Sequence, residues 1–164
     1  MRTIAIFNLK GGVGKTITTA TMAYCLATRH RKRVLVIDGD SQGNLSQYFQ
    51  VKALEGESLV DLLEGNCEPY WGDFVTETLH HRIRIIPSDG RMMDADVTSV
   101  AQGRCNPRAI EELREAIAED NGMDYILIDC APAFNASGVA ALRAADDVII
   151  PVRLDTFSTE GALS

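Results

Sequence analysis

A glycine-rich segment between an apolar run and a helical pattern constrains this chain more than any other feature. Residues 3–7 form the apolar run, residues 8–16 read Asn-Leu-Lys-Gly-Gly-Val-Gly-Lys-Thr, and residues 17–29 carry small apolar side chains at helical spacing. A buried strand, a glycine-rich turn and a helix, in that order, are the setting of a phosphate-binding loop, or P-loop. The segment therefore predicts an α/β fold with a mainly parallel sheet.

Each residue type in the loop has a use in holding phosphates. The glycines let the backbone curl so that successive N–H groups point at an anion. The helix that follows adds the positive end of its dipole. Lys15 supplies a mobile charge for β- and γ-phosphates, and the Thr16 hydroxyl can ligate Mg²⁺, a hard cation that takes oxygen ligands. The alternative is a glycine-rich turn that binds nothing.

Aspartates follow two further apolar runs. Residues 34–37 lead into Asp38 and Asp40, and residues 125–128 lead into Asp129. Ligands of open α/β sheets bind at the carboxyl ends of the strands, so we expect these carboxylates beside the loop. One of the first pair can hold the hydration shell of Mg²⁺ and the other can orient an attacking water. The alternative for that pair is a turn whose aspartates cap the next short helix.

The loop departs from the usual G-x-x-x-x-G-K-[ST] pattern, because Leu9 stands at the first glycine and Lys10 stands beside it. The form Lys-Gly-Gly-x-Gly-Lys-Thr resembles the deviant Walker A ATPases of the ParA/MinD family. Residues 38–44 resemble the family's D-x-D-P-Q-G-N segment, with serine in place of proline. Residues 129–132 are similar to its D-x-P-P segment, with alanine in place of the first proline. The resemblance runs from residue 3 to residue 163.

The resemblance implies a mainly parallel, twisted sheet with helices on both faces, in one P-loop ATPase domain over residues 1–164. Family members usually continue well past this point, so we expect the N-terminal portion of a longer domain. The implied cofactors are ATP and Mg²⁺. The implied nucleotide-binding residues are Lys10, Gly11, Gly12, Val13, Gly14, Lys15, Thr16 and Ile17. Ile17 replaces the hydroxyl residue that usually meets the α-phosphate.

The resemblance also implies roles for individual side chains. Lys10 would reach across a dimer to the partner's phosphates, Lys15 would hold its own, and Asp40 would position the hydrolytic water. The implied metal-binding residues are Thr16, Asp38 and Asp129. Asp129 ends an apolar run of the Walker B type and would bind Mg²⁺ through water.

The function implied is that of a ParA-type dimerisation switch in plasmid or chromosome partitioning. Its ATP hydrolysis would be weak alone and stimulated by a ParB-like partner, and its ATP-bound homodimer would bind DNA non-specifically. Most of the DNA-binding surface and the adenine contacts are expected beyond Ser164. The alternatives are a MinD-like, membrane-associated positioning ATPase, an iron–sulfur electron-transfer relative and a metabolic ATP-dependent ligase. Residues 42–44, Gln-Gly-Asn, resemble the partition branch more than the MinD branch.

Composition narrows the remaining possibilities. The net charge of −7 argues against a broad nucleic-acid-binding face, although a local basic patch is compatible with it. The basic run at residues 29–33 is either a solvated turn or a nucleic-acid contact. The four cysteines lack metal spacing and are interpreted as reduced thiols. No apolar run approaches the roughly 20 residues of a membrane span, so we expect a cytoplasmic protein.

The rest of the sequence predicts further elements with less detail. Ser58 is expected to cap a short helix, and Asn106 another, with proline at its first position. Residues 83–87 are expected to form an edge strand. Residues 91–101 are expected to form a helix in which Met92 and Met93 fill gaps in the core. Further helices are predicted over residues 137–145 and 156–163, with a strand over residues 147–152.

Overall fold

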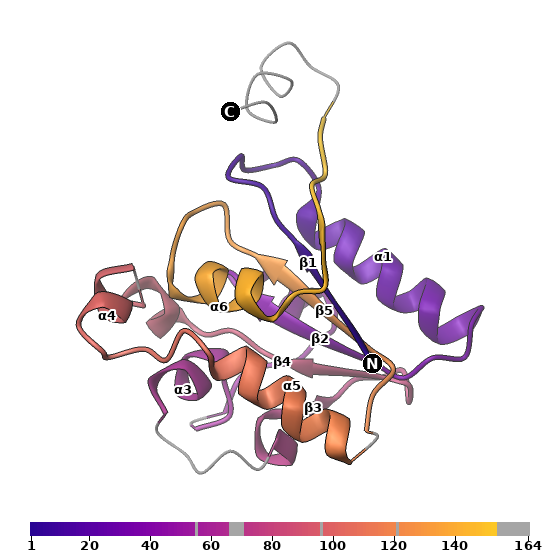
Figure 1. Cartoon of the computed structure of the whole chain (residues 1–164). Coiled ribbons are helices and arrows are strands. Elements are labelled where there is room, and N and C mark those ends of the chain that lie inside the picture. Colours follow the sequence, from indigo (N-terminus) through magenta and orange to yellow (C-terminus); the bar gives the residue numbers. More distant parts are fainter. Residues whose placement is uncertain (55, 66–70, 96, 121, 154–164) are drawn as a thin grey trace.

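The computed structural model describes residues 1–54, 56–65, 71–95, 97–120 and 122–153. In this part of the chain, six strands form one sheet in the spatial order β3-β4-β2-β5-β1-β6 (Figure 1). The strands are β1 (Arg2–Ile6), β2 (Val34–Gly39), β3 (Thr76–Glu77), β4 (Ile83–Ile86), β5 (Tyr125–Cys130) and β6 (Asp147–Ile149). The α-helices are α1 (Lys15–Thr28), α2 (Asn44–Tyr48), α3 (Leu59–Glu64), α4 (Val97–Ala101), α5 (Ala109–Glu119) and α6 (Ala136–Ala144). Two 3₁₀ turns are η1 (Trp71–Phe74) and η2 (Gly90–Met93).

The sheet is parallel except at one edge. β5 lies between β1 and β2, β6 pairs with β1, and β4 pairs with β2, all in parallel. β3 pairs with β4 in the antiparallel direction. Every residue of β2 is buried, as expected for a parallel strand covered on both faces. The predicted α/β fold with a mainly parallel sheet is confirmed.

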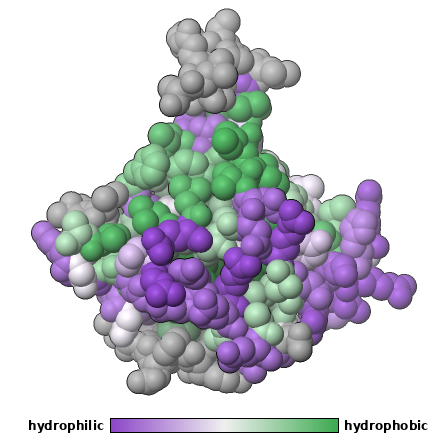
Figure 2. All heavy atoms as spheres, viewed as in Figure 1, coloured by the Kyte–Doolittle hydropathy of each residue, from purple (hydrophilic) through white to green (hydrophobic). Residues whose placement is uncertain are grey.

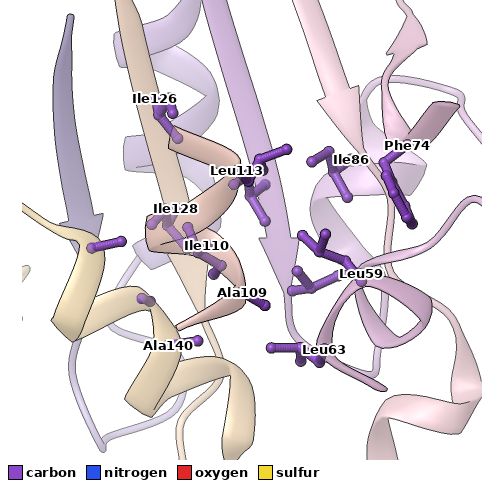
Figure 3. Close-up of a cluster of buried hydrophobic side chains, with 14 of the residues drawn as sticks. Leu59, Leu63, Phe74, Ile86, Ala109, Ile110, Leu113, Ile126, Ile128 and Ala140 are labelled. Carbon is purple, nitrogen blue, oxygen red and sulfur yellow. The ribbon is translucent and has the colours of Figure 1, made fainter. Parts of the chain in front are cut away.

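Helices cover both faces of the sheet, and the alternation of side chains along the strands divides the core in two. On one face, α1 and α2 pack against Val34 and Val36 of β2, and three buried alanines let α1 lie close: Ala20, Ala23 and Ala27. On the other face, α3, α5 and α6 pack against Leu35 and Ile37. Figure 3 shows this second cluster, where leucines of α3 and α5 lie among isoleucines of the strands.

Several predicted elements are placed differently in the structure. The strand at residues 83–86 is not an edge strand, because β3 pairs with its outer side. The helix predicted over residues 91–101 is instead η2 and the separate helix α4. The side chain of Asp89 accepts a hydrogen bond from the Arg91 backbone N–H and so starts η2. Met92 is buried as predicted, but Met93 is 72% exposed and fills no gap in the core.

The predicted helix caps had mixed outcomes. Ser58 and Asp61 form a reciprocal capping box at the start of α3, as the sequence indicated. Asn106 instead forms a turn, since its Oδ1 accepts from the Arg108 backbone N–H, and α5 begins only at Ala109. The helix predicted over residues 156–163 lies outside the described residues.

Candidate functional site

The loop between β1 and α1 has the backbone conformation that its glycines predict. Gly12 and Gly14 have φ angles of 70° and 92°, in the left-handed region that favours glycine. Gly14 directly precedes α1, and its carbonyl accepts the backbone N–H of Thr18. The loop therefore curls at the N-terminal end of α1, and Figure 1 shows it beyond the carboxyl ends of β1 and β5. Backbone N–H groups and the helix dipole act together there.

Lys15 lies inside this loop. Its Nζ donates to the carbonyl oxygens of Asn8 and Lys10, both at 3.0 Å, and the residue is only 7% exposed. Burial lowers the pKa of Lys15, while the negative charges of Asp129 and Asp40 act in the opposite direction. The ammonium group is therefore held within the curl by two backbone oxygens, the weaker kind of acceptor, which anionic phosphate oxygens can replace.

Asn8 positions the loop and was not singled out from the sequence. Its Oδ1 accepts the backbone N–H of Lys10 at 2.8 Å, and its Nδ2 donates to the carbonyl of Pro151 at 2.9 Å. Asn8 thus ties the start of the loop to the segment that follows β6. An asparagine directly after the apolar run, three residues before a glycine pair, was the available signal.

Asp129 is a buried carboxylate without a partner. The residue is 1% exposed, and neither of its oxygens has a hydrogen-bond partner in the described part of the chain. The pKa of Asp129 is raised to about 7, mainly by burial and further by the negative charges of Asp38 and Asp40, while Thr16 and Lys15 oppose the rise. Buried charges in proteins are normally paired or bound to metal. The Asp129 carboxylate and the Thr16 hydroxyl are oxygen groups of the kind that a divalent cation such as Mg²⁺ takes as ligands.

Asp38 has the same register as Asp129 on the neighbouring strand, but it is hydrogen-bonded. Its Oδ2 accepts from the backbone N–H and the hydroxyl of Ser46, at 2.8 and 2.7 Å. Burial raises the pKa of Asp38, and the bonds from Ser46 oppose that rise. Asp38 therefore holds the first turn of α2 against β2. The sequence allowed such a capping role as the alternative to binding a metal or a water. The role of Asp38 toward a metal stays a prediction.

Asp40 is half-buried and lies on the wall of a cleft of about 420 Å³. Its Oδ1 accepts the backbone N–H of Gln42, and no described residue donates to the other carboxylate oxygen. The lining residues are Asp40, Ser41, Gln42, Met92, Met93, Ala131, Pro132, Ala133, Phe134 and Asn135. The structure thus brings the segments after β2 and β5 to one cleft, as the two aspartate-bearing patterns predicted.

The unpartnered state of Asp129 predicts a pH-dependent stability. The pKa of Asp129 is higher in the folded protein than in the unfolded chain, so the folded state binds the proton more tightly. The stability that this proton contributes is fully present below the ordinary pKa of 3.8 and is lost as the pH rises through about 7. Asp129→Asn should therefore raise the free energy of unfolding by about 4 kcal/mol near pH 8, and by almost nothing near pH 4. Urea unfolding without Mg²⁺ or nucleotide measures the difference.

The matched control is Asp124→Asn, at the other end of the same segment. The backbone N–H of Arg33 bonds to Asp124 and holds its pKa below the ordinary value. This variant should lose stability near pH 8 instead of gaining it. A loss of stability in Asp129→Asn near pH 8 would mean that the carboxylate has a favourable partner and is not held ready for a cation.

Known proteins resemble the whole chain. A family model described as an AAA domain matches residues 1–164. The sporulation initiation inhibitor protein Soj of Bacillus subtilis is 34% identical over 96% of the chain, and the chromosome partitioning protein ParA of Caulobacter vibrioides is 35% identical over 98%. The chain belongs to the ParA/MinD family. It spans 60% and 59% of the lengths of these two relatives.

Solved structures agree with this assignment of the ParA/MinD family. Apo McdA of Cyanothece matches 99% of the chain with a TM-score of 0.86 at 27% identity, and the match covers 62% of that protein. Cobyrinic acid a,c-diamide synthase of Mycobacterium smegmatis, solved with ADP and magnesium, matches 98% of the chain with a TM-score of 0.79 at 30% identity, over 63% of its own length. No helix in the described ranges is both long and apolar enough to cross a membrane.

Proposed function

We propose that this chain is the nucleotide-binding part of a ParA-type ATPase that acts in plasmid or chromosome partitioning. The observations that carry the proposal are the Lys15 ammonium held inside the P-loop and the buried Asp129 carboxylate, which has no hydrogen-bond partner in the described ranges and whose charge acts on Lys15. A cation in the loop would serve the phosphates and a buried carboxylate would serve Mg²⁺, which are the two needs of a Mg²⁺-bound triphosphate. The partition proteins among the relatives support the cellular role.

The nucleotide would be ATP with Mg²⁺. A McdA variant solved in complex with ATP matches 98% of the chain with a TM-score of 0.85. Here the backbone N–H groups of residues 11–16 and the Lys15 ammonium would hold the phosphates. Thr16 and Asp129 would hold Mg²⁺, with Asp38 near them. Mg²⁺, when bound, would neutralise negative charge on the transferred phosphoryl group.

Asp40 would orient the hydrolytic water. It follows Asp38 by two residues, lies on the cleft and keeps one oxygen outside the local turn. Lys15 would stabilise the charge that develops on the phosphoryl oxygens, because a fixed cation in a water-poor loop acts strongly there. The hydrogen bonds between Asp38 and Ser46 would hold the carboxyl end of β2 in its pairing with β5. Asp40, two residues further on, would thereby keep its position.

Dimerisation would place a second subunit against the loop. Leu9 and Phe134 are 52% and 58% exposed beside the P-loop, and Met93 is exposed on the adjoining cleft. Apolar side chains that remain exposed around a polar site support a protein interface. Lys10, at the tip of the same loop, would contribute its ammonium to the partner's phosphates. The ATP-bound dimer would then bind DNA and respond to a ParB-like partner.

A metabolic ATP-dependent ligase is the second candidate function. The 30% identity to cobyrinic acid a,c-diamide synthase favours it as the alternative, since that protein shares the fold and was solved with ADP and magnesium. An assay for amide formation on a small carboxylic acid separates the two candidates. Partition chemistry predicts ATP hydrolysis without any such acceptor.

Asp40→Ala tests the hydrolytic part of the proposal. The variant should bind Mg-ATP as tightly as wild type, because Asp40 is not among the groups assigned to the phosphates. Its single-turnover hydrolysis should fall about 100-fold or more, because the water loses its orienting carboxylate. The control is Asp94→Ala, an exposed aspartate outside the cleft lining. Wild-type turnover in Asp40→Ala would assign the orienting role to another residue.

A further inference from the structure

A buried hydroxyl links α6 to the end of β2, beside the cleft that Asp40 lines. Ser137 lies in the first turn of α6 and is 1% exposed. Its hydroxyl donates to the carbonyl oxygen of Gly39 at 2.8 Å. Gly39 is the last residue of β2, and Asp40 follows it directly. The hydroxyl is therefore bonded to the backbone that carries the carboxylate proposed to orient the water.

The same hydroxyl contacts the loop between β5 and α6. Ser137 Oγ lies 2.9 Å from Asn135 Oδ1, which also accepts the backbone N–H of Gly138 at 2.8 Å. Asn135 is the N-cap of α6 and lines the Asp40 cleft. Because a hydroxyl has one proton and both neighbouring oxygens are acceptors, that proton is shared between them. The segment after β2 and the segment after β5 thus meet at a single hydroxyl group.

The backbone is closely packed at this contact. A Cβ atom placed on Gly39 would lie 2.8 Å from the backbone oxygen of Asp129 and 3.4 Å from Ser137 Oγ. The first of these distances is too short for a real side chain, so β2 approaches β5 more closely here than any residue but glycine allows. Closely packed interiors transmit displacements. A shift of the first turn of α6 would therefore move the backbone that leads to Asp40.

Ser137 is the one polar side chain on the buried face of α6. The buried residues of this helix are Ala136, Ser137, Gly138, Ala140, Ala141 and Ala144. Figure 2 shows hydrophobic side chains (green) gathered in the upper part of the molecule, along the segment that follows β6. Alanine has the higher helix propensity and buries no hydroxyl. Helix stability alone would favour alanine at position 137, so the serine indicates a use for its hydrogen bond.

We propose that Ser137 is a positioning residue for ATP hydrolysis, because its bond to Gly39 holds the Asp40 carboxylate at the cleft. Ser137 acts through the backbone of β2. Ser46 holds Asp38 from the opposite face of the sheet, where α2 packs, so the end of β2 is held from both faces. The inference rests on the proposed function and adds to it, since it makes α6 a determinant of where Asp40 lies.

Ser137→Ala in the full-length protein tests this role. Single-turnover ATP hydrolysis should fall about 10-fold, because the orienting carboxylate loses its fixed position. The affinity for Mg-ATP, measured by calorimetry, should match wild type. The matched control is Ser99→Ala in α4. Ser99 is also buried, and its hydroxyl donates to a backbone carbonyl, that of Asp94, at 2.9 Å. This control should lose similar thermal stability and keep the wild-type rate of hydrolysis.

Combining the change with Asp40→Ala separates positioning from general damage. In the Asp40→Ala background, Ser137→Ala should slow hydrolysis no further, because the carboxylate that it positions is already absent. A further 10-fold fall in that background would overturn the proposal, as would weaker Mg-ATP binding by Ser137→Ala alone. Wild-type hydrolysis by Ser137→Ala would refute this inference and leave the proposed function standing. Failure of the wild-type protein to hydrolyse ATP would refute both.

Discussion

Lys15→Ala should weaken Mg-ATP binding at least about 100-fold, because the triphosphate loses the charge-assisted hydrogen bonds of its main fixed cation. The variant should still fold. Among the described residues, the Lys15 ammonium bonds only to the carbonyls of Asn8 and Lys10, and burial lowers its pKa, so its charge is disfavoured in the free protein. Isothermal titration calorimetry on the full-length protein gives the affinity, and thermal unfolding verifies the fold.

Lys52→Ala is the matched control for this change. Lys52 is an exposed lysine outside the loop, so its removal alters the net charge equally without touching the nucleotide site. Calorimetry should return the wild-type affinity for it. Unchanged Mg-ATP affinity in Lys15→Ala would refute the P-loop assignment, whereas equal losses in both variants would show a general charge effect.

Lys10→Ala should separate nucleotide binding from dimerisation. Within one subunit the phosphates are already served by Lys15 and the backbone N–H groups, so the affinity for ATP should change little. The backbone of Lys10 is held by Asn8, and alanine keeps that N–H bond. The expected loss is in ATP-dependent dimerisation, because a cation that reaches the opposite subunit gives ATP a differential affinity for the dimer. Hydrolysis and ATP-dependent DNA binding should fall with it.

Patterns that are local in sequence predicted the fold and most of the site. The mainly apolar run over residues 3–7, placed before a glycine-rich turn, predicted a buried strand, and β1 covers Arg2–Ile6. The aspartates at the ends of β2 and β5 lie in register because parallel strands carry their carboxyl ends to one edge. Such features depend on periodicity and on residue type, both of which are visible in the sequence.

Contacts between distant residues could not be predicted in the same way. The strand β3, which pairs with β4, has only the two residues Thr76 and Glu77. Two residues are too few to show the alternation of side chains that predicts a strand. Arg91 bonds to Asp61 and Asp89, so its position was set by α3 and not by a helical pattern through residue 101. The same limit applied at the site, where neither the link from Asn8 to Pro151 nor that from Ser46 to Asp38 has a sequence signature.

Light scattering of two full-length proteins tests the central claim, that ATP joins two subunits through Lys10. Asp40→Ala should bind ATP without hydrolysing it and should therefore double its mass when Mg-ATP is added. Asp40→Ala with Lys10→Ala should bind ATP and remain a monomer. With Mg-ADP, neither protein should dimerise. Equal dimerisation of both proteins in Mg-ATP would contradict the account, because Lys10 would then be an ordinary loop lysine.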